Sequence, residues 1–355
     1  MNNYSVASQK IRSIFWDVPE SEYRAYPAIS QSALTKYDRE GFRTIEQETE
    51  TTGAMIRGSL IDCLLTEGEE VFNSKYYVAT YCEITDKPKK IVDILYEHYG
   101  HLYEELELVP ESYILRVIKE QEYYSNRKDR TNINNIIKEG TIYYRNLIKG
   151  KGKTVVLKPQ YDEAKATSDC LKQHQYTSKF FNPDKLSEYE EIIYQPKIIL
   201  KDPRLPYELK CMYDLIYINH KEKYILPMDL KTTSSNEEDF ERNYVNWRYD
   251  IQSSLYTCIL KHMLKVIGLD YEIKNFTFIV VNPSNLTPIL WEDVNCFNFG
   301  DRINQYGTLY KGPFTLAREY YYYTSSKNYS YDIEAVNNNG IKKLDIFHKL
   351  QKEEK

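Results

Sequence analysis

The sequence predicts a mixed α/β protein in which helices flank a central mixed β-sheet, with a helical part in front of the sheet. Three observations support this class. Up to about residue 185, apolar side chains recur mainly at helical spacing. Between 189 and 231 the pattern changes to short apolar or alternating runs separated by turn residues, which is typical of strands. One long helical stretch and two further strand-like runs follow.

The first half of the chain is predicted to form an arm followed by helices. Residues 1–30 are expected to form an extended arm because Pro19 and Pro27 interrupt it. Ser30 is a favourable N-cap for a helix over 31–36. Apolar spacing predicts further helices over 54–65, 86–150 and 159–174.

The second half of the chain is expected to build the sheet. Strands are predicted over 189–200, 207–218, 223–231, 276–281 and 287–291, with a long helix over 237–266 between the third and the fourth. A helix interrupted by glycines is expected over 298–323. The predicted organisation is an arm at 1–30, a helical part at 31–185, a core at 186–324 and a peripheral or partly disordered tail at 325–355.

Composition limits the classes of function. The formal net charge of −5 gives no global basic field and argues against a non-specific DNA coat, although a local basic groove can coexist with an acidic exterior. Tyrosine is frequent, at 35 of 355 residues, and we expect core packing rather than base stacking to account for most of it. The six cysteines are scattered without the spacing of a zinc or iron–sulfur site.

No apolar run is long enough to span a membrane, and the first residues have no apolar signal core. These features predict a reduced, cytoplasmic protein without disulfides and without a membrane partner.

The predicted strand over 223–231 contains candidate catalytic residues. Side chains alternate along a strand, so Asp229 and Lys231 share a face. Asp214 comes from the preceding strand, and two carboxylates beside a lysine suit Mg²⁺-assisted hydrolysis of a phosphodiester. Gln252 and Tyr256 lie four residues apart and therefore on one face of the following helix. A lone Asp-x-Lys pattern is weak evidence, and the surrounding residues strengthen it.

These residues resemble the PD-(D/E)XK nuclease core and are most similar to its RecE, or exonuclease VIII-like, branch. The resemblance runs from about residue 28 to 295. It rests on the segments 28–34 (AISQSAL), 57–65 (RGSLIDCLL), 210–214 (KCMYD), 228–233 (MDLKTT) and 248–252 (RYDIQ), with Tyr256. It implies a restriction-endonuclease-like core over 186–324.

The resemblance also implies roles by position. Asp214 and Asp229 match metal-binding acids, Lys231 matches the catalytic lysine, and Gln252 and Tyr256 match the helix motif that supports the lysine and the DNA phosphate. Glu191 matches an upstream acid that assists metal binding, and Glu188 and Glu190 are alternatives for it. The chain departs from the pattern at Asp62, where the family usually has histidine. An aspartate still ligates Mg²⁺, with Mn²⁺ as the alternative metal and one or two ions left open.

The function expected from these features is a Mg²⁺-dependent exodeoxyribonuclease that degrades linear double-stranded DNA 5′ to 3′ for recombination or repair. The resemblance implies a viral setting, DNA ends as substrate, a single-strand annealing protein as partner and a homo-oligomeric ring. Two alternatives stay open. One is an endonuclease or structure-specific repair nuclease on the same core, since the fold does not fix the substrate. The other is a catalytically silent DNA-binding or interaction protein.

Overall fold

The computed structural model describes residues 3–47, 52–79, 83–123, 126–150, 152–304 and 307–342. The chain divides into two compact units, one made of Met1–Thr51 with Leu171–Lys355 and the other of Thr52–Cys170. With 52% helix and 17% strand, the protein is of the mixed α/β class, as the sequence predicted.

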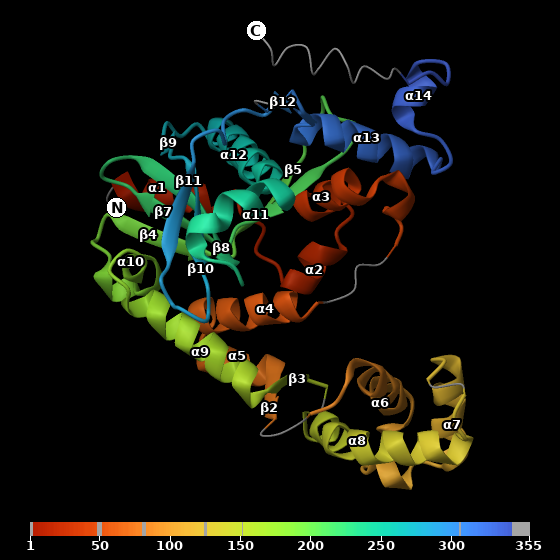
Figure 1. The fold of residues 1–355 in the computed structure, drawn as a ribbon. Coiled ribbons are helices and arrows are strands. Elements are labelled where there is room, and N and C mark those ends of the chain that lie inside the picture. The colour runs from red at the N-terminus through yellow and green to blue at the C-terminus, as the bar shows by residue number, and fades with distance from the viewer. Residues whose placement is uncertain are drawn as a thin grey trace. The chain divides into compact units, whose positions relative to one another are not determined.

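The first unit is built on a six-stranded mixed sheet (Figure 1). Its main path has the order β11-β10-β8-β7-β4, and β9 pairs with β8 beside β10. The pairs β10–β8 and β9–β8 are parallel, and the other neighbours are antiparallel. The bounds are β4 Glu190–Tyr194, β7 Leu215–Asn219, β8 Tyr224–Thr232, β9 Glu272–Ile273, β10 Phe276–Val281 and β11 Ile289–Asp293.

Two smaller sheets belong to the same unit. A three-stranded sheet has the order β1-β6-β5, with β1 Ile29–Ser30, β6 Leu209–Met212 and β5 Lys197–Leu200. The short strands β12 Arg302–Ile303 and β13 Leu309–Tyr310 form an antiparallel pair. The helices of the unit are α1 Asn3–Arg12, α2 Glu20–Ala25, α3 Gln31–Glu40, α10 Ser178–Phe181, α11 Phe240–Asn246, α12 Tyr249–Val266, α13 Pro313–Ser326 and α14 Ile333–Asn337. Single 3₁₀ turns lie at η1 Phe42–Thr44, η3 Pro183–Lys185 and η4 Glu237–Asp239.

The second unit is helical with one small parallel sheet. Its strands β2 Tyr76–Ala79 and β3 Thr154–Leu157 pair with each other. Its helices are α4 Gly53–Thr66, α5 Gly68–Lys75, α6 Asp86–Tyr99, α7 Glu111–Glu120, α8 Asp129–Gly150 and α9 Lys158–Gln173, with a 3₁₀ turn at η2 Leu106–Leu108. The predicted helices over 54–65, 86–150 and 159–174 are thus confirmed, with breaks inside the second.

The predicted arm at 1–30 is wrong in its N-terminal part, because α1 and α2 form there. Ile11 is fully buried, and Ile14 and Tyr23 are nearly so. Pro19 does not interrupt a helix but precedes α2 as its N-cap. Ile11 and Ile14 belong to the core of the first unit, and such burial stabilises helices that the local sequence pattern does not predict.

Four other predicted elements are divided in the structure. The strand at 189–200 breaks at Gln195, whose φ of 49° lies in the left-handed region, and the strand at 207–218 breaks after β6. The helix at 237–266 ends at Asn246 and restarts as α12. The region 298–323 contains β12 and β13 before α13, and Gly312, the N-cap of α13, approaches the carbonyl of Gly300 too closely for a side chain. Of the tail, α14 is described, and 343–355 lie outside the described residues.

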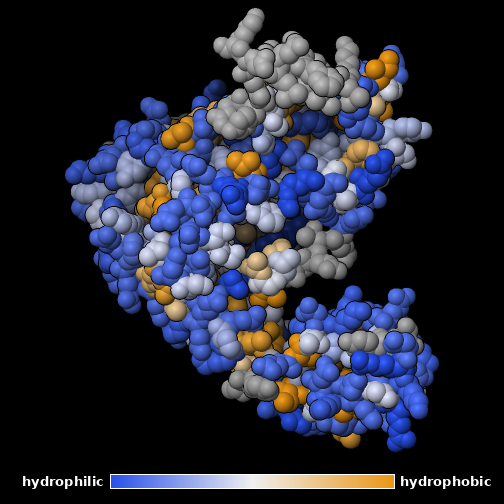
Figure 2. All heavy atoms as spheres, viewed as in Figure 1, coloured by the Kyte–Doolittle hydropathy of each residue, from blue (hydrophilic) through white to orange (hydrophobic). Residues whose placement is uncertain are grey.

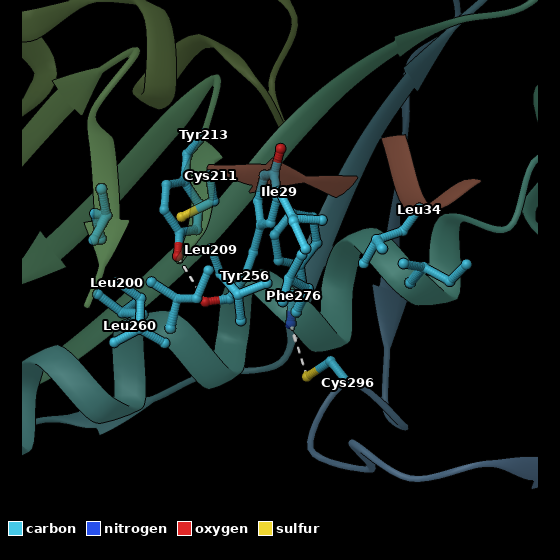
Figure 3. Packing of buried hydrophobic residues seen from close by; sticks show 14 of the residues in the cluster. Ile29, Leu34, Leu200, Leu209, Cys211, Tyr213, Tyr256, Leu260, Phe276 and Cys296 are labelled. Carbon is cyan, nitrogen blue, oxygen red and sulfur yellow. Dashed lines mark hydrogen bonds between the residues drawn. The ribbon is translucent and has the colours of Figure 1, made fainter. Parts of the chain in front are cut away.

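The core of the first unit lies between the sheets and α12. Figure 3 shows Tyr256 and Leu260 of α12 facing side chains of the β1-β6-β5 sheet and Phe276 of β10. Tyr213 donates from its hydroxyl to the carbonyl of Tyr256 at 2.7 Å and packs edge-on against its ring. This contact fixes the middle of α12 on the strands.

Hydrophilic side chains cover most of the face shown in Figure 2, and apolar side chains appear there as small separate patches. Among the described residues no helix is both long and apolar enough to cross a membrane.

A buried lysine joins α2 to the three-stranded sheet. Lys210 of β6 is 6% exposed, and its ammonium donates to the carbonyls of Tyr23, Arg24 and Tyr26 at 2.6–3.0 Å. These carbonyls lie at the C-terminal end of α2, where a helix leaves groups without donors, although that of Tyr23 also accepts from the amide of Tyr26 at 3.3 Å. Burial holds the pKa of Lys210 below its ordinary value.

We therefore expect Lys210→Met to destabilise the protein by about 1–3 kcal/mol, because carbonyls would lose their donor while staying buried. Urea unfolding measures the change. Lys265→Met is the matched control, since Lys265 is an exposed residue of the last turn of α12 and its loss should change the free energy of unfolding much less. Equal effects of the two substitutions would contradict a role for the buried ammonium in holding α2.

Candidate active site

The end of β8 brings a carboxylate and an ammonium into contact. Asp229 is 3% exposed, and its Oδ2 lies 2.6 Å from Nζ of Lys231. The two side chains thus lie on the same face of β8, as predicted. Burial alone would lower the pKa of Lys231, but the negative charges around it, chiefly that of Asp229, outweigh burial and hold this pKa above its ordinary value. Lys231 is therefore a cation at neutral pH.

Asp214 lies beside this pair because of strand register. Leu215 of β7 faces Met228 of β8, so Asp214 stands opposite Asp229. One carboxylate oxygen of Asp214 accepts from the amide of Leu230 at 2.6 Å. The two acids that the sequence singled out therefore come together on neighbouring strands.

Gln252 reaches the same site from α12. Its Nε2 donates to Oδ1 of Asp229 at 2.6 Å, and the side chain is only 4% exposed. The amide thus orients the carboxylate, while Lys231 contacts the other oxygen. Tyr256, one turn further along α12, is 7% exposed and packs against Tyr213 and Phe276. The contacts of its ring are those of a core residue that supports the helix.

Glu191 is not brought to this site. It pairs across the sheet with Ile218, and Ile218 pairs with Ile225, four residues before Asp229. At about 3.3 Å per residue this separation is roughly 13 Å along the strand. Glu191 instead accepts from Ser8 at 2.8 Å, contacts His220 at 3.0 Å and pairs with Arg12. Glu191 therefore anchors α1 to β4. The sequence shows only an acid near the start of a strand, and this pattern does not distinguish an anchor from a metal ligand.

The two alternatives for the upstream position are Glu188 and Glu190, and Glu188 is exposed just before β4. Glu190 pairs with Lys179 and accepts from Tyr217. Asp62 lies half-buried on α4 of the helical unit, which is described by itself, so its proposed part in metal binding stays a prediction.

Aromatic rings around Lys231 were not anticipated as part of the site. Its ammonium lies 4.6 Å from the ring centre of Tyr249 and 6.0 Å from that of Phe278. Tyr249 in turn stacks on Phe240 at 5.6 Å. Cation–π attraction to such rings favours the charged lysine. No local sequence pattern indicated them, because the strand register that places Phe278 opposite Asp229 is set by the fold.

Arg248 fixes where α12 begins. Its φ of 54° lies in the left-handed region, which costs a non-glycine residue roughly 1 kcal/mol or more. The buried guanidinium contacts Asp38, donates to both oxygens of Asp250 at 2.9 and 3.2 Å, and donates to the carbonyl of Lys311 at 2.7 Å. These partners occupy its guanidinium.

The residues present fit a hard divalent cation. Oδ2 of Asp229 is buried and accepts no hydrogen bond from the described residues, although Lys231 is close. No group of three or more histidine, cysteine, aspartate or glutamate side chains suited to a metal occurs in the described part of the chain. Mg²⁺ is commonly held by one or two carboxylates, with waters and substrate oxygens completing the shell. Asp214 and Asp229 could supply that pair.

Comparison with known proteins adds no relative. No family model matches the chain, and no curated protein matches it.

We expect Arg248→Met to lower the free energy of unfolding by about 3–5 kcal/mol, because Asp38 would lose its guanidinium partner and Asp250 would keep only the longer ion pair with Arg302 at 3.5 Å. Arg204→Met is the control. Arg204 is exposed and pairs with Asp202, so its loss should destabilise the protein much less than the loss of Arg248. Urea denaturation of both variants gives the comparison, and a small effect at Arg248 would show that the junction does not depend on it.

Glu191 should make stability depend on acid. Burial would raise its pKa, but the hydrogen bonds from His220 and Ser8 and the charge of Arg12 hold the pKa below its ordinary value. The stabilising contribution is therefore complete above about pH 5 and decreases as pH falls through the folded-state pKa. Glu191→Gln should be less stable than wild type at pH 7, and the difference should shrink toward pH 3. A constant difference in urea unfolding across this range would contradict the assignment.

Proposed function

We propose that this protein is a metal-dependent deoxyribonuclease that hydrolyses phosphodiester bonds, with linear double-stranded DNA as its substrate and exonucleolytic cleavage as its mode. One observation carries the proposal most. Asp229 is held between Lys231 and Gln252 at 2.6 Å each, with Asp214 opposite on the next strand. A buried carboxylate fixed by both an ammonium and an amide is costly to maintain without a role. Lys231, whose pKa is held above its ordinary value, is a group of the kind that concentrates at functional sites.

Lys231 supports the proposal through its charge. Because its pKa is held above the ordinary value, the side chain is a donor and not a base in this arrangement. An ammonium of this kind can stabilise the negative charge that develops on phosphate oxygens and can orient a water molecule. Its side chain keeps 20% of its surface exposed, so a phosphate can approach it from outside.

Gln252 and Tyr249 keep these groups in place. Gln252 holds the carboxylate of Asp229 in one orientation, and Tyr249 lies against the ammonium of Lys231. Both come from the first turn of α12, which Arg248 positions. Mg²⁺ bound by Asp214 and Asp229 would lower the pKa of a coordinated water and neutralise charge on the phosphate.

End-labelled linear duplex DNA tests the proposal. Wild-type protein with Mg²⁺ should release label, and chelation of the metal should stop the release. Lys231→Ala should reduce the rate by about 10²-fold or more, as expected when a preorganised donor to the transition state is lost. Lys221→Ala removes an exposed lysine from the β7–β8 turn and serves as the charge-matched control, with an unchanged rate expected.

A closed circular duplex separates the modes of cleavage. An exonuclease should leave it intact, whereas cutting of the circle would replace the exonuclease by an endonuclease on the same residues. Absence of metal-dependent cleavage of either DNA, with Mg²⁺ or with Mn²⁺, would overturn the enzymatic proposal. A shift of linear DNA in a gel without cleavage would then identify a DNA-binding protein.

A further inference from the structure

A cavity of about 390 Å³ lies between α11 and the β10–β11 end of the large sheet. Aromatic side chains form its walls, namely Phe240, Tyr244, Phe278 and Trp291. Phe240 lies 5.5 Å from Phe278 and 6.0 Å from Trp291 between ring centres. The residues that build the cavity all belong to the first unit, where α11 and β11 can be followed in Figure 1.

The polar atoms of the walls are already engaged. Tyr244 donates its hydroxyl to Asp293 at 2.8 Å, and Trp291 donates its indole N–H to the carbonyl of Glu237 at 3.0 Å. These bonds hold the two rings in place. The faces of these aromatic rings can attract a cation, and the face of tryptophan attracts it most strongly.

The rim of the cavity is acidic and apolar. Glu241 and Glu292 are exposed at its edge, and the described residues that line it include no lysine or arginine. Asp293 also lines it, but its carboxylate accepts from Ser253, Tyr244 and the amide of Asn295. Val245 and Val294 are large apolar side chains left 47% and 68% exposed. A partner that covers them would gain by removing apolar surface from water.

We propose that this cavity docks a basic segment of a partner protein, with an arginine side chain inserted between the aromatic walls. The guanidinium stacks on the ring faces and pairs with Glu241 or Glu292 at the rim. Apolar neighbours of that arginine in the partner cover Val245 and Val294. The complementarity of charge selects this occupant over nucleic acid, because carboxylates at the rim repel phosphates.

Arginine suits the cavity better than other side chains. Its planar cation stacks on aromatic rings and can bind a carboxylate in the same pose. The proposal is independent of the nuclease activity, since it concerns binding alone and uses none of the residues assigned to metal or phosphate. Phe278 is the wall between the cavity and Lys231.

Fluorescence anisotropy with a labelled peptide tests the docking. The probe is a fluorescein-labelled hexapeptide in which two arginines flank one leucine, and the comparison peptide carries citrulline in place of both arginines. Citrulline keeps the shape and removes the charge. We expect the arginine peptide to bind at least about tenfold more tightly, since a stacked cation paired with a carboxylate should contribute that much.

Substitutions locate the binding. The double variant Glu241→Gln with Glu292→Gln should weaken the arginine peptide by about tenfold. The control Glu222→Gln with Glu238→Gln removes the same charge from exposed positions outside the cavity and should change affinity less than twofold. Val245→Arg places a cation of the chain itself at the rim and should block the peptide.

Two results would overturn the proposal: equal binding of the two peptides by the wild-type protein, or equal weakening of the arginine peptide by the two double variants. The comparison of arginine with citrulline uses only the wild-type protein, so it decides the question even if a variant fails to fold. An active nuclease that binds neither peptide would reject this inference alone, and binding by an inactive protein would reject only the proposed function.

Discussion

The site depends on the break between α11 and α12. A continuous helix over 237–266 would not turn at Arg248, and the first turn of α12 would not meet the end of β8. The left-handed conformation of Arg248 makes the turn, and ion pairs with Asp38 and Asp250 stabilise it. An unfavourable backbone conformation is thus held by buried charge, which is a common arrangement where geometry serves a function.

From that junction, two side chains of α12 reach β8. Tyr249 lies against the ammonium of Lys231, and Gln252 donates to Asp229. The carboxylate and the ammonium would each be costly to bury alone, so each needs the other and the helix above them. The same helix is fixed further along by the hydrogen bond from Tyr213 to the carbonyl of Tyr256. The helix α12 therefore both packs the core and positions residues of the site.

Acidic residues in this fold have different roles, and the residues next to them in the sequence do not show which role each one has. Glu191 stands in a strand, as Asp229 does, but its partners Ser8, Arg12 and His220 make it an anchor for α1. Glu237 is buried and accepts from the amides of Asn282 and Asn285 at 2.8 and 2.9 Å, which ties η4 to the β10–β11 loop. Glu241 and Glu292 stay at the surface, where their charge is available to a partner.

The sequence by itself determined the fold class, most of the helices and the common face of Asp229 and Lys231, because these follow from periodicities that each segment carries locally. Only the tertiary structure decided where the strands and the long helix break, since those breaks depend on burial and on partners far along the chain. It also separated Gln252, which contacts Asp229, from Glu191, which does not. Strand register and long-range ion pairs determine such contacts, and a local sequence pattern predicts neither of them.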